Sequence, residues 1–228
     1  LYPIIVGILA VPTLLILRQP DLGSALIILI MSFTILYPSL QLKKRTLSIY
    51  KWSILIVTLS IIIFPKQISK NILPLVLKDY QIERFNLNDY HHKMAIKAIK
   101  NGQLLGYSDM INSLSKTGQL PEANTDSIYA TYVETVGIAG SLILCLLYCL
   151  LVIIGYTTFC RTHNTFGAMI SFGITTYTII HCFINMGMMI GWLPITGVPL
   201  PFLSYGGSTT IVSFSCYGIL HSVYLNKY

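Results

Sequence analysis

Long apolar runs are the feature of this chain that most restricts its fold. A helix that crosses a membrane needs about 20 apolar residues to span about 30 Å of hydrocarbon. Of the 228 residues, 54% are hydrophobic and only 10% are charged, whereas a typical soluble domain has about 25% charged residues. The sequence therefore predicts an all-α, polytopic membrane helix bundle and argues against an ordinary cytosolic enzyme. About six transmembrane helices are expected, at residues 1–17, 24–40, 52–64, 128–160, 166–193 and 208–225. The run 128–160 exceeds one crossing, so its start is expected to project beyond the hydrocarbon or its helix to tilt.

The charges of the short loops predict the orientation. Residues 41–51 hold four cations and no acid, which places them in the cytoplasm by the positive-inside rule. Alternation then puts 65–125 and 194–207 outside, and Arg161 and Lys227 inside. We expect a single membrane domain, 1–228, in the cytoplasmic membrane. Its extracytoplasmic loop would be 65–126, and its active face would lie outside.

The net charge points to lipid partners. The formal charge of +7 includes 15 Lys and Arg, which in a soluble protein would suggest nucleic acid. Here the polar residues lie between apolar runs, so anionic or phosphate-bearing lipids are the expected partners and nucleic acid is not. The five cysteines form no C-x-x-C pair, and the adjacent His91 and His92 lack a third ligand at useful spacing. No metal site is therefore predicted.

One segment of the outer loop has helical spacing. Lys93, Lys97 and Lys100 recur at i, i+4 and i+7 beside apolar residues. Two interpretations are open: an amphipathic helix on the membrane surface, or a helix with a solvated lysine face.

Two acids near the fourth run are candidate reactive groups. Asp126 directly precedes the expected helix, at the depth of lipid headgroups, where low dielectric would raise its pKa and suit it to act as a general base. It could instead cap the helix N-terminus. Glu134 lies inside the run, where an acid is costly and is a functional candidate. The alternative for Glu134 is a protonated or paired group near the interface.

The segment 194–208 holds three prolines and three glycines between two apolar runs. It cannot form a regular helix, and irregular backbone at membrane depth must be buried in protein or line a cavity. Its candidate donors to an anionic group are Ser204, Tyr205, Gly206, Gly207 and Ser208.

Three motifs occur together in the chain. They read Gln-Pro-Asp-Leu-Gly-Ser-Ala at 19–25, Pro-Glu-Ala-Asn-Thr-Asp at 121–126, and the segment 194–208, which follows Asn-Met-Gly at 185–187. In this order they resemble the SEDS family (shape, elongation, division, sporulation), most closely its RodA branch. The resemblance covers essentially the whole chain, from the family's fifth membrane helix to its tenth. We therefore expect an N-terminally incomplete chain that is inactive by itself.

The resemblance implies a peptidoglycan glycosyltransferase. The family polymerises glycan strands from lipid II at the outer face of the cytoplasmic membrane, in cell elongation and shape control for this branch. Asp126 is implied as the catalytic base that deprotonates the acceptor sugar's 4-hydroxyl, and Glu134, Lys93, Lys97 and the donors of 204–208 as substrate-binding groups. The implied partners are lipid II, the nascent strand, membrane lipids and a class B penicillin-binding protein, a transpeptidase. No cofactor is implied, although a divalent cation could neutralise the diphosphate.

Several positions depart from the family pattern and bear on specificity and rate. The family's His-Thr-Asp-Phe-Ile-Phe is Asn-Thr-Asp-Ser-Ile-Tyr at 124–129, and Thr135 replaces a second acid after Glu134. Further departures lie at 94–95, 100–103 and 113–114. Two other functions remain open: a flippase for lipid-linked precursors, since transporters also use broken helices around a polar cavity, and an inactive scaffold that binds a transpeptidase.

Overall fold

The computed structural model describes residues 11–16, 18, 24, 27–28, 30–32, 90–106 and 111–226. The chain divides into two compact units, Leu1–Phe85 and Asn86–Tyr228, so the boundary falls inside the expected outer loop. All described residues of the first unit are helical, and all except Arg18 belong to the predicted runs 1–17 and 24–40. The predicted run 52–64, the basic segment 41–51 and the turn 19–23 lie outside the described residues.

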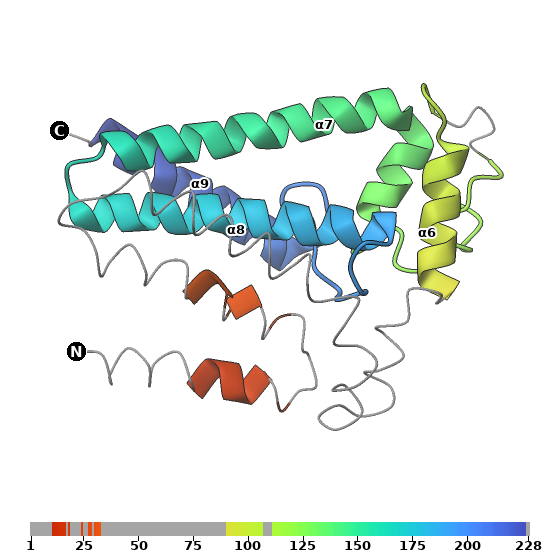
Figure 1. Cartoon of the computed structure of the whole chain (residues 1–228), viewed down its shortest axis with the longest axis horizontal. Coiled ribbons are helices and arrows are strands. Elements are labelled where there is room, and N and C mark those ends of the chain that lie inside the picture. Colours follow the sequence, from red (N-terminus) through yellow and green to blue (C-terminus); the bar gives the residue numbers. More distant parts are fainter. Residues whose placement is uncertain are drawn as a thin grey trace. The chain divides into compact units, whose positions relative to one another are not determined.

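The described residues of the second unit form four helices. They are α6 (Tyr90–Asn101), α7 (Ile128–Arg161), α8 (Thr165–Ile190) and α9 (Gly207–Leu225). The last three confirm the predicted runs to within a few residues, and every regular element among the described residues is a helix. α7 and α8 are each long and apolar enough to cross a membrane. Figure 1 shows α7, α8 and α9 running alongside one another, with α6 beside the start of α7.

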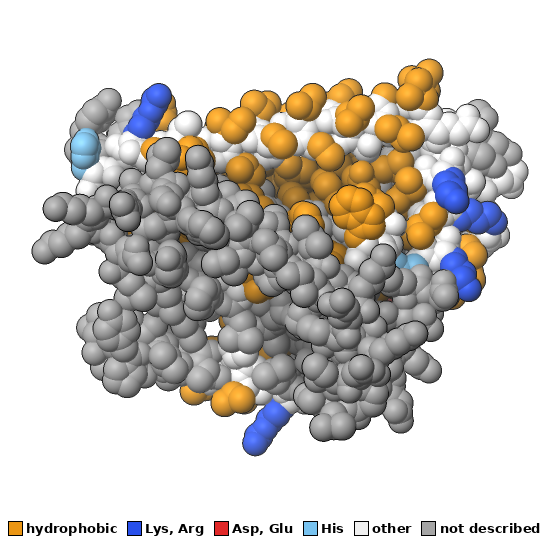
Figure 2. Space-filling view, viewed as in Figure 1, with side chains coloured by type: hydrophobic (Ala, Val, Ile, Leu, Met, Phe, Trp, Pro, Cys, Tyr) orange, Lys and Arg blue, Asp and Glu red, His pale blue; other side chains and the backbone are white. Residues whose placement is uncertain are grey.

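The outer side of α7 is suited to a hydrocarbon environment. Figure 2 shows hydrophobic side chains along its length, with Lys and Arg side chains only near its two ends. These apolar side chains are exposed in the structure, which would be costly in water over so large a continuous patch. The exposed set comprises Leu142, Ile143, Leu146, Leu147, Leu150, Ile153 and Ile154. The predicted helical membrane protein is thereby borne out in the part of the chain that the structure describes.

α6 confirms the helix predicted in the outer loop. Its three lysines are exposed, while His92, Ala95 and Ala98 are buried against α7 and α8. The small alanines allow this close approach, and the His92 Nε2 atom donates to the Leu193 carbonyl at 2.9 Å. The buried face of α6 therefore packs on protein, and its lysine face lies at the surface.

α7 is broken at Gly137, where φ is 81° and ψ is −177°. This region of backbone conformation is open essentially to glycine alone. Figure 1 shows the first turns of α7 bending sharply away from its long remainder. The break explains why the run 128–160 can be longer than one membrane crossing, because only the part after Gly137 needs to follow the bundle axis.

A loop enters the break and satisfies its backbone. The amide of Ile138 donates to the Gln103 carbonyl at 3.0 Å, and the amide of Ala139 donates to the Leu104 carbonyl at 3.1 Å. A Cβ added at Gly137 would collide with the backbone of this loop at Leu104 and Gly106. The loop carbonyls thus replace the helical partners that the break removes.

We predict that Gly137→Ala lowers the melting temperature of the detergent-purified protein. Backbone strain and the collision with the loop should together cost about 2–5 kcal/mol. Two matched variants separate these causes. Gly118 has φ 71° but open space around it, so Gly118→Ala should show strain alone, and Gly218, helical with open space, should tolerate alanine without loss. Equal melting temperatures for Gly137→Ala and Gly218→Ala would contradict this account of the break.

Candidate active site

Asp126 lies in the turn of residues 121–127 that leads into α7. The residue at the N-cap position of α7 is Ser127, and no side chain caps this end. No described residue donates a hydrogen bond to the Asp126 carboxylate. Of the two roles that the sequence left open, capping is therefore not the one the structure uses.

The backbone around Asp126 is tied to the segment 194–208. The Asn185 Nδ2 atom donates to the Asp126 carbonyl at 2.9 Å and to the Val198 carbonyl at 2.7 Å. The Ser204 hydroxyl donates to the Thr125 carbonyl at 2.8 Å. The amide of Tyr205 donates to the Asn124 carbonyl at 2.8 Å. Segments far apart in the sequence therefore meet at Asp126.

A second set of bonds fixes the turn from the side of α6. The Ser127 hydroxyl donates to the Pro121 carbonyl at 2.7 Å, so the proton between Ser127 and His91 must come from the imidazole. The His91 Nε2 atom accordingly donates to the Ser127 oxygen at 2.6 Å. The turn that carries Asp126 is thus held by α6 as well as by α8.

The electrostatics of Asp126 suit a proton acceptor. Burial is the larger cause that raises its pKa above the ordinary value of 3.8, and the negative charge of Glu122 raises it further. The Thr125 hydroxyl donates to the Glu122 carboxylate at 2.9 Å and orients it. Gly197 lies against the Asp126 carboxylate, since a Cβ there would be 3.3 Å from Asp126 Oδ2. A half-buried carboxylate with a raised pKa can accept a proton from a hydroxyl group.

Glu134 is fully buried and holds the outer loop. Its Oε1 atom accepts from the Leu114 amide at 2.9 Å and from Asn101 Nδ2 at 3.4 Å, and its Oε2 atom accepts from the Ser115 amide at 3.1 Å. The structure thus gives Glu134 internal partners, in agreement with the paired interpretation. Contact between Glu134 and a substrate stays a prediction.

Of the other predicted substrate-binding residues, one is engaged inside the protein and the rest lie at the start of α9, just before it, or on α6. Ser204 is buried, and its hydroxyl also accepts from the Leu200 amide at 2.7 Å, so it is engaged inside the protein. Tyr205 is 82% exposed. Gly206, Gly207 and Ser208 form the start of α9, with Gly206 at its N-cap, and Lys93 and Lys97 are exposed on α6. Their contact with a substrate remains predicted.

The segment 194–208 has the irregular backbone predicted for it up to the start of α9. Val198 and Leu200 are buried, and side chains of neighbouring helices meet its carbonyls. His181 donates to the Pro199 carbonyl at 3.2 Å, and the Tyr148 hydroxyl donates to the Pro201 carbonyl. The prolines and glycines break the helix, and polar side chains from α7 and α8 compensate for the lost backbone bonds.

Two side chains that bind the turn of Asp126 were given no such role by the sequence. The sequence placed Asn185 in a motif without a role, although a lone amide in an apolar run is itself a signal of buried hydrogen bonding. Asn185 is fully buried, and its Oδ1 atom has no hydrogen-bond partner among the described residues. His91 was considered only as a metal ligand. Among the described residues, no three His, Cys, Asp or Glu side chains come together to hold a metal.

Comparison with known proteins gives a consistent family. The FtsW/RodA/SpoVE family model, described as "Cell cycle protein", matches residues 1–228. "Peptidoglycan glycosyltransferase MrdB" of Escherichia coli K12 is 31% identical over 230 residues, covering 95% of this chain and 58% of that protein. "Probable peptidoglycan glycosyltransferase FtsW" of Bacillus subtilis 168 is 34% identical over 220 residues, covering 92% of this chain and 53% of that protein. The chain thus spans little more than half the length of these relatives.

The fold also matches a solved structure. A chain from "Structural coordination of polymerization and crosslinking by a peptidoglycan synthase complex" aligns with a TM-score of 0.64 and 24% identity. The alignment covers 98% of this chain and 62% of that chain. Since the family model matches the chain from end to end, this protein belongs to the FtsW/RodA/SpoVE family, the SEDS family that its three motifs resemble.

Proposed function

We propose that the full-length protein polymerises peptidoglycan glycan strands from lipid II, with Asp126 as the general base. The observation that carries this proposal is the Asp126 carboxylate itself. It has a raised pKa and no hydrogen-bond donor among the described residues, while its backbone is fixed by Asn185. A base in such a setting is ready to take a proton from an incoming hydroxyl group. The relatives named peptidoglycan glycosyltransferases support the choice of substrate.

The reaction balances with Asp126 as the proton acceptor. The 4-hydroxyl oxygen of the acceptor sugar attacks the anomeric carbon of the donor chain and gives its proton to Asp126. The new glycosidic bond forms as the bond from the anomeric carbon to the diphosphate oxygen breaks. The electron pair leaves with undecaprenyl diphosphate, whose negative charge needs cations or hydrogen-bond donors nearby. We assign that task to the exposed Lys93, Lys97 and the start of α9.

The proposed setting is the bacterial cytoplasmic membrane, with Asp126 on the extracytoplasmic side. The positive-inside pattern of the sequence supports this orientation. A class B penicillin-binding protein is the proposed partner, in keeping with the family resemblance. The exposed apolar side of α7 is a surface on which a partner's membrane helix could pack.

We predict that Asp126→Asn in the full-length protein reduces glycan strand formation from lipid II by about a hundredfold or more, because the amide cannot accept the proton. Asparagine has nearly the same shape, so the melting temperature should stay close to that of the unchanged protein. Glu122→Gln, which removes an acid four residues away, is the matched control and should retain polymerisation. Undiminished polymerisation by the Asp126→Asn protein would overturn the assignment of the base.

Two further assays, read beside strand formation, separate the other two functions. A flippase would move lipid-linked precursor across vesicle membranes with polymerisation blocked, and strand formation would not depend on Asp126. A scaffold would co-purify with the transpeptidase while the unchanged protein made no strands. Strand formation that depends on Asp126 excludes both as the sole function.

We also predict a shift in the pH dependence of polymerisation. Asp126 acts only when deprotonated, so activity should fall as the pH drops through its pKa, which lies above 3.8. The charge of Glu122 contributes to that raised pKa, so Glu122→Gln should move the acidic limb of the rate profile to lower pH. Glu122 is exposed, and salt should therefore reduce the difference between the two proteins. A limb that stays in place at low ionic strength, or moves to higher pH, would contradict the role of Asp126.

A further inference from the structure

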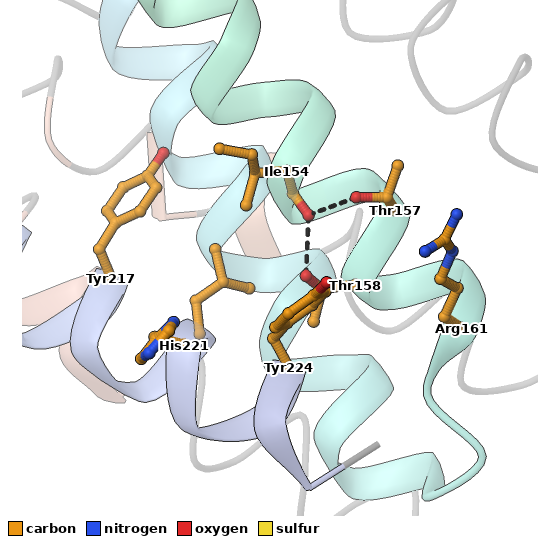
Figure 3. Close-up of a pocket in the computed structure, with 8 residues that line it drawn as sticks. Ile154, Thr157, Thr158, Arg161, Tyr217, His221 and Tyr224 are labelled. Carbon is orange, nitrogen blue, oxygen red and sulfur yellow. Dashed lines mark hydrogen bonds between the residues drawn. The ribbon is translucent and has the colours of Figure 1, made fainter. Parts of the chain in front are cut away.

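A cavity of about 480 Å³ lies between the last turns of α7 and α9. Figure 3 shows Thr157, Thr158 and Arg161 projecting from α7, and Tyr217, His221 and Tyr224 from α9. Ile154 and Leu220 complete the described lining with apolar surface. Asp126 lies before the first residue of α7 and Arg161 is its last, so this cavity is separate from the candidate active site.

The described lining holds the positive charge of Arg161 and no acid. No Asp or Glu follows Glu134 in the sequence, and none is among the described lining residues. Arg161 and His221 are exposed and are the two lining groups that can carry positive charge. The planar Arg guanidinium offers several N–H donors in a fork that matches a phosphate group. The charge at the mouth of the cavity therefore favours an anionic ligand.

The hydroxyl groups of the wall are engaged inside the protein. Thr157 and Thr158 donate to the Ile154 carbonyl at 3.0 and 2.8 Å, as the dashed lines of Figure 3 show. Thr178 donates to the Ile174 carbonyl, so the Tyr217 hydroxyl is the donor in its 2.9 Å bond to Thr178. With these donors occupied, Arg161 and His221 carry the recognition of charge, and the remaining wall is largely hydrocarbon and aromatic.

The position of the cavity suits a lipid. At 1.5 Å per residue, α7 extends about 36 Å from Gly137 to Arg161, close to the roughly 30 Å of a hydrocarbon core. The cavity therefore lies about one membrane thickness from the break beside the candidate active site. Arginine at such a depth holds its charged end at the level of the phosphates while its stem remains in apolar surroundings.

We propose that this cavity binds an anionic phospholipid. Arg161 binds the headgroup phosphate from α7, His221 contacts the headgroup from α9 on the other side of the lining, and an acyl chain lies against Ile154 and Leu220. A soluble phosphate would use these polar groups but leave the apolar wall uncovered, so the lipid is the occupant that fits the whole lining.

Native mass spectrometry of the full-length protein can test this proposal by titration with phosphatidylglycerol or with phosphatidylcholine of the same acyl chains. Phosphatidylglycerol should bind on the order of tenfold more tightly, because each cation at the membrane surface favours the anionic headgroup. The double variant Arg161→Gln/His221→Gln should bind the two lipids equally. Lys116→Gln removes one exposed charge outside this lining and should keep the preference.

Two further measurements complete the test. One asks whether binding needs the apolar volume of the cavity as well as its charge, and the other asks whether the ligand is a lipid or a free anion. Ile154→Trp fills the cavity from a half-exposed position and should weaken phosphatidylglycerol binding although Arg161 and His221 remain. Excess inorganic phosphate should not displace the lipid. The proposal is overturned if the double variant keeps the preference, if Ile154→Trp binds as the unchanged protein does, or if excess phosphate displaces the lipid.

Discussion

The structure depends on one constraint: in apolar surroundings every backbone N–H and C=O group needs a partner. The break at Gly137 would leave amides unpaired, and the carbonyls of Gln103 and Leu104 meet them. The irregular segment 194–208 poses the opposite problem, with free carbonyls, and Asn185, His181 and other side chains supply donors. The outer loop and the segment 194–208 are therefore fixed to the helices by hydrogen bonds to backbone groups.

This constraint also explains how the backbone at Asp126 is fixed without use of its carboxylate. Its position is set through main-chain atoms, by Asn185 to its own carbonyl and by Ser204 to the carbonyl of Thr125. The carboxylate is not used for these bonds, so its oxygens remain for the proposed proton transfer. The Oδ1 atom of Asn185 has no partner among the described residues, and a buried acceptor without a partner is unfavourable.

Charge is distributed unequally along the second unit. Its described acids, Glu122, Asp126 and Glu134, lie at or before the first turns of α7, and none follows them in the sequence. Near the start of α7, burial and the charge of Glu122 raise the pKa of Asp126. At the other end Arg161 and His221 have no described acid beside them. One end of the bundle is thus suited to accept a proton, and the other to bind an anion.

The sequence by itself determined the helical membrane fold, the bounds of α7, α8 and α9 to within a few residues and the irregular segment, and it supplied Asp126 as the proposed base. These follow from apolar length, from proline and glycine chemistry and from local motifs, all of which act between near neighbours. Only the tertiary structure decided that α7 breaks at Gly137, that Glu134 holds the loop at Leu114, and that Ser204 is tied to Thr125. The last pair is 79 residues apart, and periodicity carries no information about partners at such separation. The sequence supplies the polar groups, and the need of buried backbone groups for hydrogen-bond partners decides which of these groups come into contact.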